Sequence, residues 1–357
     1  MKASLKHHAL PLLSLLTLFI VLLVSQVSGQ NKNSSSSLKL ARSLENSIQK
    51  TARLSSKRVV AIRPLKKRSR SADGVVRRPS RSGGSGVIIH ASGFILTNDH
   101  VVDGVESCEV IFHNGQRVPG AVWARDEVGD LALVKVKVAW PLPVAKFGDS
   151  QLVKVGQPVI AVGNALGLSL DNGEPAVTFG ILSGTHRYQG GSRVYGDALQ
   201  FDAAVNPGNS GGGLFDLDGH LLGITGRISV RGTVSKSVGV GFAVPAHQIQ
   251  GGLKDMMAGR DIVHGFLGVR FQKDAEGPGV MVAALSPNSP AELAGLRVTD
   301  VLLEINGVKL DHSVRLQNLL STQKAGQKLT IKYRRGMEIK SVVVTLVRKR
   351  KSRRRSQ

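Results

Sequence analysis

From Gly83 onward the chain is a succession of short apolar runs, rich in Val, Ile and Leu, that are separated by turn-forming residues. Runs of about four to eight residues with this composition are typical of β-strands. Because no helical spacing of apolar residues comes between them, the pattern predicts an all-β barrel or sandwich and argues against an α/β sheet. The runs lie at 85–89, 94–97, 108–112, 131–138, 158–162, 177–182 and 221–225.

Helical patterns lie on either side of this region. Residues 41–54 have a weak helical pattern, and 58–62 form a short strand-like run. The first well-marked helix is 245–257, with Pro245 at its start and Gly259 just after its end.

A second pattern begins near Gly265 and mixes helices with strands. Residues 289–295 combine a serine cap, a proline at the first helical position and a final glycine, which predicts a short helix. A strand over 300–305 leads into an Asn-Gly hairpin turn, and 313–320 has the apolar spacing of a helix. These elements predict a small α+β domain after the β-rich one.

The N-terminus has the pattern of a targeting segment. Lys2 and Lys6 precede an apolar run over 9–24 and small residues at 27–29, which predicts export through a signal that is cleaved or retained as an anchor. The expected divisions are a signal peptide at 1–29, a polar linker at 30–42, a β-rich domain at 43–258 with an exposed basic loop at 64–82, an α+β domain at 262–347 and a basic tail at 348–357.

The net charge of +23 is concentrated outside the expected folded domains. Residues 30–81 carry 15 basic and two acidic residues, the tail adds seven basic residues, and 82–347 is close to neutral. This distribution favours solvated basic arms over a shaped nucleic-acid-binding face, although the arms could contact polyanions or a membrane surface. Cys108 is the only cysteine, so no intrachain disulfide can form, and its strand-like run predicts a buried structural role.

Three short motifs carry the candidate chemistry. His100 follows one strand, Asp130 precedes another, and Ser210 lies between glycines on a predicted tight turn. A base, an acid that orients it and a nucleophile in the chain order His, Asp, Ser form the triad of chymotrypsin-class proteases. The turn Gly208-Asn209-Ser210 predicts an oxyanion hole, with the N–H groups of Gly208 and Ser210 as its donors. This chemistry requires neither a metal ion nor a cofactor, and none is expected.

Over residues 43 to 347 the chain resembles the HtrA/Deg serine proteases. The resemblance implies a trypsin-like double β-barrel that cleaves unfolded or damaged exported proteins in quality control or stress. The segments that carry it are Gly93-Phe94-Ile95-Leu96-Thr97-Asn98, His100-Val101-Val102, Asp130-Leu131-Ala132-Leu133, Phe147-Gly148-Asp149-Ser150, Val155-Gly156-Gln157, Val162-Gly163-Asn164, Asp202 to Gly212 and Gly241-Phe242-Ala243-Val244-Pro245.

Some positions depart from the family pattern. Gly213 replaces the usual Pro, and Asp99 replaces the usual Asn beside the histidine, where an added acid could act on His100. Ala204 lies six residues before Ser210, where trypsin-like enzymes that select Lys or Arg carry an acid. We therefore expect an apolar specificity pocket at Ala204 and Val205 that prefers small or medium aliphatic residues.

The second domain resembles a PDZ domain. The resemblance implies that its N–H groups receive a peptide C-terminus at a carboxylate loop, with the 313–320 helix as the other wall of the groove. The loop residues are Gly265, Phe266, Leu267, Gly268 and Val269.

The family resemblance also implies a homo-oligomer, most commonly a trimer clasped by aromatic residues near the start of the protease domain. Residues 30–81 contain no Phe, Tyr or Trp, so Leu40, Leu44 and Ile48 would have to hold such a trimer. The basic surroundings would repel at low salt. Two other functions stay open on the sequence: a non-proteolytic chaperone or PDZ scaffold, and a nucleic-acid-binding protein that uses the arms alone.

Overall fold

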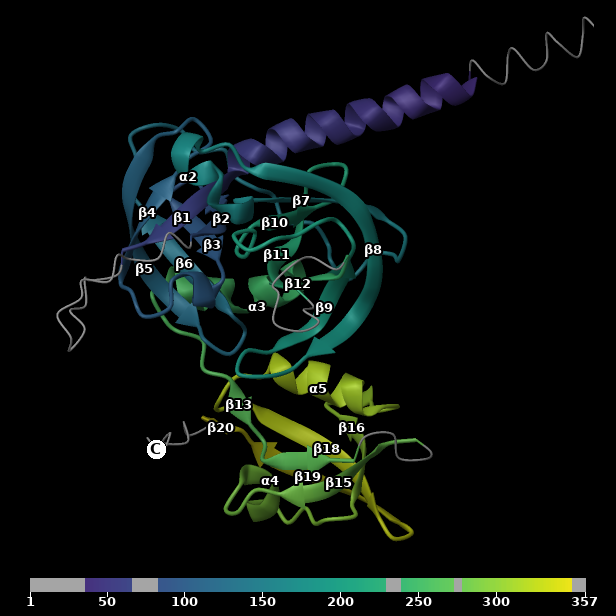
Figure 1. The fold of residues 1–357 in the computed structure, drawn as a ribbon. Helices are drawn as coiled ribbons and strands as arrows, with labels where there is room; N and C mark the ends of the chain where they lie inside the picture. The colour runs from purple at the N-terminus through teal and green to yellow at the C-terminus, as the bar shows by residue number, and fades with distance from the viewer. Residues whose placement is uncertain (1–35, 66–82, 229–238, 273–277, 349–357) are drawn as a thin grey trace, which may run out of the picture. The chain divides into compact units, whose positions relative to one another are not determined.

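The computed structural model describes residues 36–65, 83–228, 239–272 and 278–348 (Figure 1). The expected signal peptide, most of the basic loop and nearly all of the basic tail lie outside these ranges. Within the described ranges, none of the helices has the length and the apolar composition needed to cross a membrane.

A helix over residues 36–58 comes first. It begins inside the segment 30–42 that was expected to be a linker, because Lys39, Leu40 and Ala41 are good helix formers that extend the pattern of the following turns. Leu40 and Leu44 are exposed.

The first six strands close into a barrel in the order β1-β2-β3-β6-β5-β4. Its core contains Val60, Ile88, Ile95 and Val134, and Cys108 is fully buried among them, as expected. The strands are β1 Val59–Pro64, β2 Gly84–His90, β3 Phe94–Thr97, β4 Ser107–Ile111, β5 Arg117–Asp126 and β6 Leu131–Val136, with the short 3-10 helix η1 Asp99–Val101 after β3.

Six further strands close a second barrel in the order β10-β11-β12-β9-β8-β7. Leu182, Phe201 and Leu214 lie in its core. The elements are β7 Pro158–Gly163, η2 Ala165–Gly167, α2 Ser169–Asn172, β8 Ala176–Gln189, β9 Tyr195–Phe201, β10 Gly213–Phe215, β11 Leu221–Ile228, β12 Gly241–Pro245 and α3 Ala246–Met257. The prediction of a double β-barrel is confirmed.

The C-terminal part is an α+β domain whose main sheet has the order β14-β15-β16-β18-β19, so that β14 is an edge strand. The predicted cap at 289–295 is present, since Ser289 Oγ accepts the Glu292 N–H and Pro290 occupies the first turn of α4. The elements are β13 Gly265–Phe266, β14 Val269–Phe271, β15 Val280–Leu285, α4 Pro290–Leu293, β16 Val301–Ile305, β17 Val308–Lys309, α5 Ser313–Ser321, β18 Lys328–Arg335, β19 Glu338–Thr345 and β20 Val347–Arg348.

The polypeptide between α3 and β13 is tied to the first barrel. Asp261 Oδ1 accepts the Arg125 N–H at 2.8 Å, and His264 Nε2 lies 2.7 Å from Asp126 Oδ1. Burial lowers the pKa of His264, but the bond to Asp126 outweighs it and holds that pKa above its usual value. The segment between α3 and β13 therefore contacts the end of β5 that leads into Asp130.

Candidate active site

His100 and Asp130 form a direct pair at one end of the first barrel. His100 lies in η1, directly after β3, and Asp130 lies in the turn that precedes β6. Nδ1 of His100 is 2.8 Å from Oδ2 and 3.0 Å from Oδ1 of Asp130, and the His100 backbone N–H donates to Oδ1 at 3.1 Å. The carboxylate therefore fixes both the imidazole and the backbone that carries it.

Asp130 is held in place by more than the histidine. It is buried, has a left-handed φ of 57°, and its backbone carbonyl accepts from Asn98 Nδ2 at 2.8 Å. The Tyr195 hydroxyl donates to Oδ2, and Arg193 Nε lies 2.9 Å from Oδ1. None of these three partners was identified from the sequence.

Ser210 reaches the site from the second barrel, on the turn between β9 and β10. Its hydroxyl donates to the Gly226 carbonyl at 3.1 Å, and within the described residues it makes no hydrogen bond to His100. Catalytic hydrogen bonds are often long or misaligned before substrate binds. Rotation about the serine Cα–Cβ bond can redirect the hydroxyl.

The backbone around Ser210 orients two N–H groups. In a trans peptide the carbonyl and the N–H point in opposite directions. The Pro207 carbonyl accepts from the Leu166 N–H at 2.7 Å, and the Asn209 carbonyl accepts from Thr225 Oγ1 at 2.8 Å. The Gly208 N–H therefore points away from the Pro207 carbonyl, and the Ser210 N–H points away from the Asn209 carbonyl. Neither N–H donates to a backbone carbonyl in the described residues. The Asn209 N–H differs, because it donates to Asn206.

This turn requires glycine at position 208. Gly208 has φ of 101°, and a Cβ there would lie 2.1 Å from the Asn164 carbonyl oxygen. A side chain would therefore shift the peptide whose N–H is the first candidate oxyanion donor.

Ser85 on β2 connects the nucleophile turn to the first barrel. Its N–H donates to the Ser210 carbonyl at 2.8 Å, and its buried hydroxyl donates to the Gly208 carbonyl at 2.7 Å. The same hydroxyl accepts the Asn164 N–H at 2.7 Å. Ser85 therefore fixes the position of Ser210 relative to the strands that carry His100.

The acid at position 99 is neutralised by basic side chains. The Asp99 carboxylate is buried and pairs with Arg125 Nη1 at 2.7 Å and with Arg193 Nη2 at 3.1 Å. From the sequence, an unpaired carboxylate at this position could have acted on His100. The Asp99 carboxylate is instead enclosed by two guanidinium groups.

A small cavity opens beside Ser210. Val205 lines it, whereas Ala204 is exposed outside it and accepts from Thr178 Oγ1 through its carbonyl. The other lining residues are Phe201, Asn206, Asn209, Thr225, Gly226 and Phe242. The two phenylalanines were missed by the sequence analysis, because only the closed barrel brings β9 and β12 together here.

A second Ser-His-Asp row lies elsewhere in the same barrel. Ser150 Oγ is 2.8 Å from His247 Nδ1, and His247 Nε2 is 3.1 Å from Asp197. Burial raises the pKa of Asp197, but hydrogen bonds from His247 and His186 outweigh it and hold that pKa low. Ser150 is 4% exposed and also accepts the His247 N–H, so its role is structural.

The predicted carboxylate loop spans β13 and the start of β14. Leu267 is buried, and Gly268 has φ of 86° where a Cβ would lie 2.1 Å from the Ser289 side chain. Two backbone hydrogen bonds hold the loop against the 286–291 segment. The Leu267 carbonyl accepts the Ala291 N–H, and the Gly268 carbonyl accepts the Ser286 N–H. Gly265 and Phe266 pair with β20, and Val269 begins the edge strand β14.

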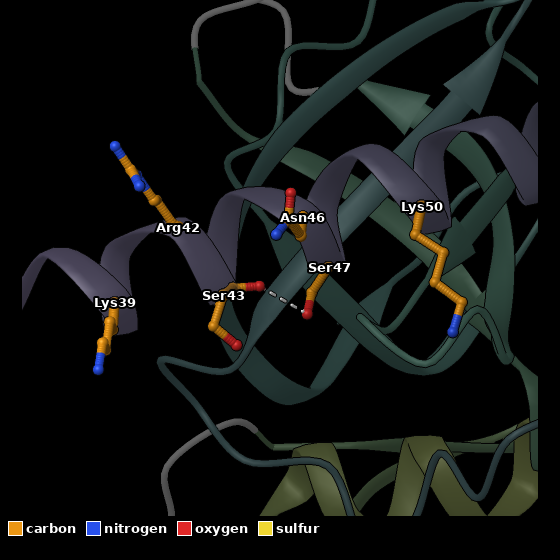
Figure 2. Close-up of a pocket in the computed structure, with 6 residues that line it drawn as sticks. All are labelled: Lys39, Arg42, Ser43, Asn46, Ser47 and Lys50. Atoms are coloured by element: carbon orange, nitrogen blue, oxygen red, sulfur yellow. Dashed lines mark hydrogen bonds between the residues drawn. The ribbon is translucent and has the colours of Figure 1, made fainter.

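A shallow depression on the N-terminal helix is chemically unlike the triad. Figure 2 shows its lining residues, which are Lys39, Arg42, Ser43, Asn46, Ser47 and Lys50. It contains cations and neutral polar groups but no acid or histidine, so it offers no general base.

Comparison with known proteins agrees with this architecture. Residues 84–224 match the family of trypsin-like peptidase domains, and residues 265–346 match the PDZ domain. A solved HtrA-type protease, AlgW with a tripeptide, has a TM-score of 0.70 and 29% identity, over 85% of this chain and 97% of that one.

Two curated relatives illustrate the similarity at the sequence level. A probable periplasmic serine endoprotease DegP-like of Chlamydia pneumoniae is 34% identical over 273 residues, covering 74% of this chain and 54% of that protein. The chain thus spans about half the length of that relative. A putative serine protease HhoA of Synechocystis sp. is 37% identical over 277 residues, covering 71% of this chain and 67% of that protein. With trypsin-like barrels, a following PDZ domain and these relatives, the chain belongs to the HtrA/Deg family of serine proteases.

Proposed function

We propose that the chain is a serine endopeptidase in which His100, Asp130 and Ser210 form the catalytic triad. Asp130 holds the Nδ1–H tautomer of His100, which leaves Nε2 to accept the Ser210 proton as Oγ attacks a peptide carbonyl. His100 then returns this proton to the leaving amine. The N–H groups of Gly208 and Ser210 stabilise the oxyanion, and water releases the acyl-enzyme by the same steps.

The observation that carries this proposal is the His100–Asp130 pair, with Nδ1 2.8 Å from the carboxylate. A fluorophosphonate probe tests it, because the oxygen of a serine activated by a neighbouring base attacks the phosphorus and displaces fluoride, which leaves the serine phosphonylated. We expect one label per chain, on Ser210, and parallel degradation of casein. An unlabelled protein that still binds unfolded clients would instead support a non-proteolytic chaperone or scaffold.

The substrates we propose are unfolded or damaged polypeptides. Relatives from Chlamydia pneumoniae and Haemophilus influenzae are named as probable periplasmic serine proteases, which supports an exported location, periplasmic or secreted, and a role in protein quality control. Peptide C-termini are the proposed ligands of the PDZ domain. They would add to β14, whose outer edge has no partner strand among the described residues, and end at the loop 265–269.

Cleavage is expected after small or medium aliphatic residues. Val205, Phe201 and Phe242 supply apolar surface to the cavity beside Ser210, whose other side chains are uncharged, and no acid is among its lining residues that could pair with Lys or Arg. Mass-spectrometric mapping of casein fragments should show Val, Ala, Ile or Leu before most cleaved bonds. Cleavage that occurs mainly after Lys or Arg would contradict this pocket assignment.

A homo-oligomer, most simply a trimer, is also part of the proposal. The exposed Leu40 and Leu44 provide apolar surface on the N-terminal helix. Because the surrounding segment is basic, the oligomer should become more stable as ionic strength rises. Light scattering at micromolar protein across a salt series measures this, and a monomer at every salt concentration would exclude it. The basic arms are proposed to contact polyanions or a membrane surface.

A further inference from the structure

Arg193 lies against the proposed triad although no motif contains it. It belongs to the loop between β8 and β9, and its side chain is 26% exposed. Its Nε is 2.9 Å from Asp130 Oδ1, and its Nη2 is 3.1 Å from Asp99 Oδ2 and 3.4 Å from Asp103 Oδ2. One guanidinium therefore contacts three carboxylates.

The neighbours of Arg193 in the chain are anchored to the same turn. The Val194 N–H donates to the Val128 carbonyl at 2.7 Å, and the buried Tyr195 donates its hydroxyl to Asp130. Three consecutive residues thus contact the 128–130 turn, so the backbone aims Arg193 at Asp130.

The carboxylates of Asp99 and Asp130 are largely removed from water. Asp99 and Asp130 are each 2% exposed, and a buried carboxylate is strongly destabilised unless a cation or several donors accompany it. Arg125 pairs with Asp99 but is not among the partners of Asp130. Burial lowers the pKa of Arg193, but its bond to Asp99 and the nearby acids outweigh this and raise that pKa, so the side chain remains a cation.

We propose that Arg193 is a positioning residue for the proteolytic reaction, which holds the Asp130 carboxylate in the orientation that receives His100 Nδ1. This inference rests on the proposed function. Oδ1 of Asp130 is shared by Arg193 and the His100 N–H, while Oδ2 receives the Tyr195 hydroxyl and lies nearest to the imidazole. Without Arg193, the carboxylate loses its only guanidinium partner among the described residues.

Arg193 also has an electrostatic effect on the histidine. Its positive charge beside Asp130 partly offsets the negative charge that this carboxylate presents to the imidazole. Among the described residues, Tyr195 contacts Asp130, Asp99 and Asp103 contact Arg193, and Arg125 contacts Asp99. The acid limb of the kcat/KM profile should therefore move to higher pH when Arg193 is neutralised.

The test compares Arg193→Gln with a matched control, Arg117→Gln. Arg117 also pairs with an acid, Glu109, and donates to the Leu170 carbonyl, and neither partner belongs to the triad. We expect Arg193→Gln to lower kcat about tenfold, to change KM less than about twofold, and to move the acid limb of the kcat/KM profile to higher pH. Arg193→Lys should recover part of kcat, and Arg117→Gln should match the wild type.

A double variant tests the charge balance. Asp99→Asn in the Arg193→Gln background removes a negative charge that Arg193 no longer covers, so the acid limb should move back toward the wild-type position. The downfield proton resonance of His100 Nδ1–H, measured by NMR, should shift or broaden in Arg193→Gln without any turnover being required.

These outcomes separate the two proposals. If the wild type labels and cleaves while Arg193→Gln keeps its kcat, pH profile and Nδ1–H resonance, the role of Arg193 is wrong and the protease stands. A loss of kcat that is equal at every pH, with no recovery in Arg193→Lys, would also reject positioning in favour of a general effect on folding. A wild type that neither labels nor cleaves would overturn both.

Discussion

Replacement of Ser210 by Ala is expected to lower kcat for casein by about 10⁶-fold, because removing the nucleophile of a triad costs about as much as removing the whole triad. The fold should be retained, since within the described part of the chain the Ser210 hydroxyl makes one hydrogen bond, to the Gly226 carbonyl, and such a bond contributes about 1 kcal/mol. Release of acid-soluble peptide measures the rate, and thermal unfolding followed by circular dichroism measures the fold.

Ser150→Ala is the matched control for this experiment. Ser150 also belongs to a Ser-His-Asp row, but its hydroxyl is buried and occupied by His247. The control should label with fluorophosphonate and cleave casein at close to the wild-type rates, even if its melting temperature falls. Substantial cleavage by Ser210→Ala would place the nucleophile elsewhere and refute the proposed triad.

Asp130→Asn should lower kcat about 10⁴-fold, as expected when the acid of a triad becomes an amide. An amide can donate a hydrogen bond to His100 Nδ1, which favours the tautomer with its proton on Nε2 and leaves no acceptor for the Ser210 proton. The left-handed φ of 57° at this position is tolerated by Asn, so the backbone of the turn should persist. Steady-state kinetics on a peptide substrate give kcat and KM separately.

Asp197→Asn makes the same chemical change at a second carboxylate that contacts histidines. Asp197 lies 3.1 Å from His247 and 2.6 Å from His186, outside the proposed triad. Its variant should keep kcat within about threefold of the wild type, because Asp197 contacts neither the proposed triad nor the cavity beside Ser210. If Asp130→Asn lost less than tenfold, Asp130 would not be orienting the base.

The three positions of the proposed triad could be selected from the sequence because each lies in a local pattern. His100 follows a strand, Asp130 precedes one, and Ser210 lies between glycines, so short windows were sufficient. Strands were predicted where apolar runs are continuous. β5 was missed because Pro119 and Gly120 interrupt its apolar pattern and the charged residues Arg117, Arg125 and Asp126 lie at its ends.

The supporting residues could not be predicted in this way. Ser85 bonds to a residue 123 positions away in the sequence, and Arg193 lies in a glycine-rich loop with no periodicity. Phe242 lines the cavity beside Ser210 only because the second barrel closes. Each of these contacts depends on tertiary structure, which secondary-structure propensities and the spacing of apolar residues do not encode.

The single cysteine, Cys108, is an intrinsic probe for local opening of the first barrel. Burial raises the pKa of the Cys108 thiol to about 12, so a thiol reagent can react only when β4 separates from its neighbours. The rate of modification then counts these opening events directly, without an introduced label and without interference from a second thiol. A client peptide or inhibitor that tightens the barrel would slow this rate, which makes ligand binding visible even in a catalytically dead variant.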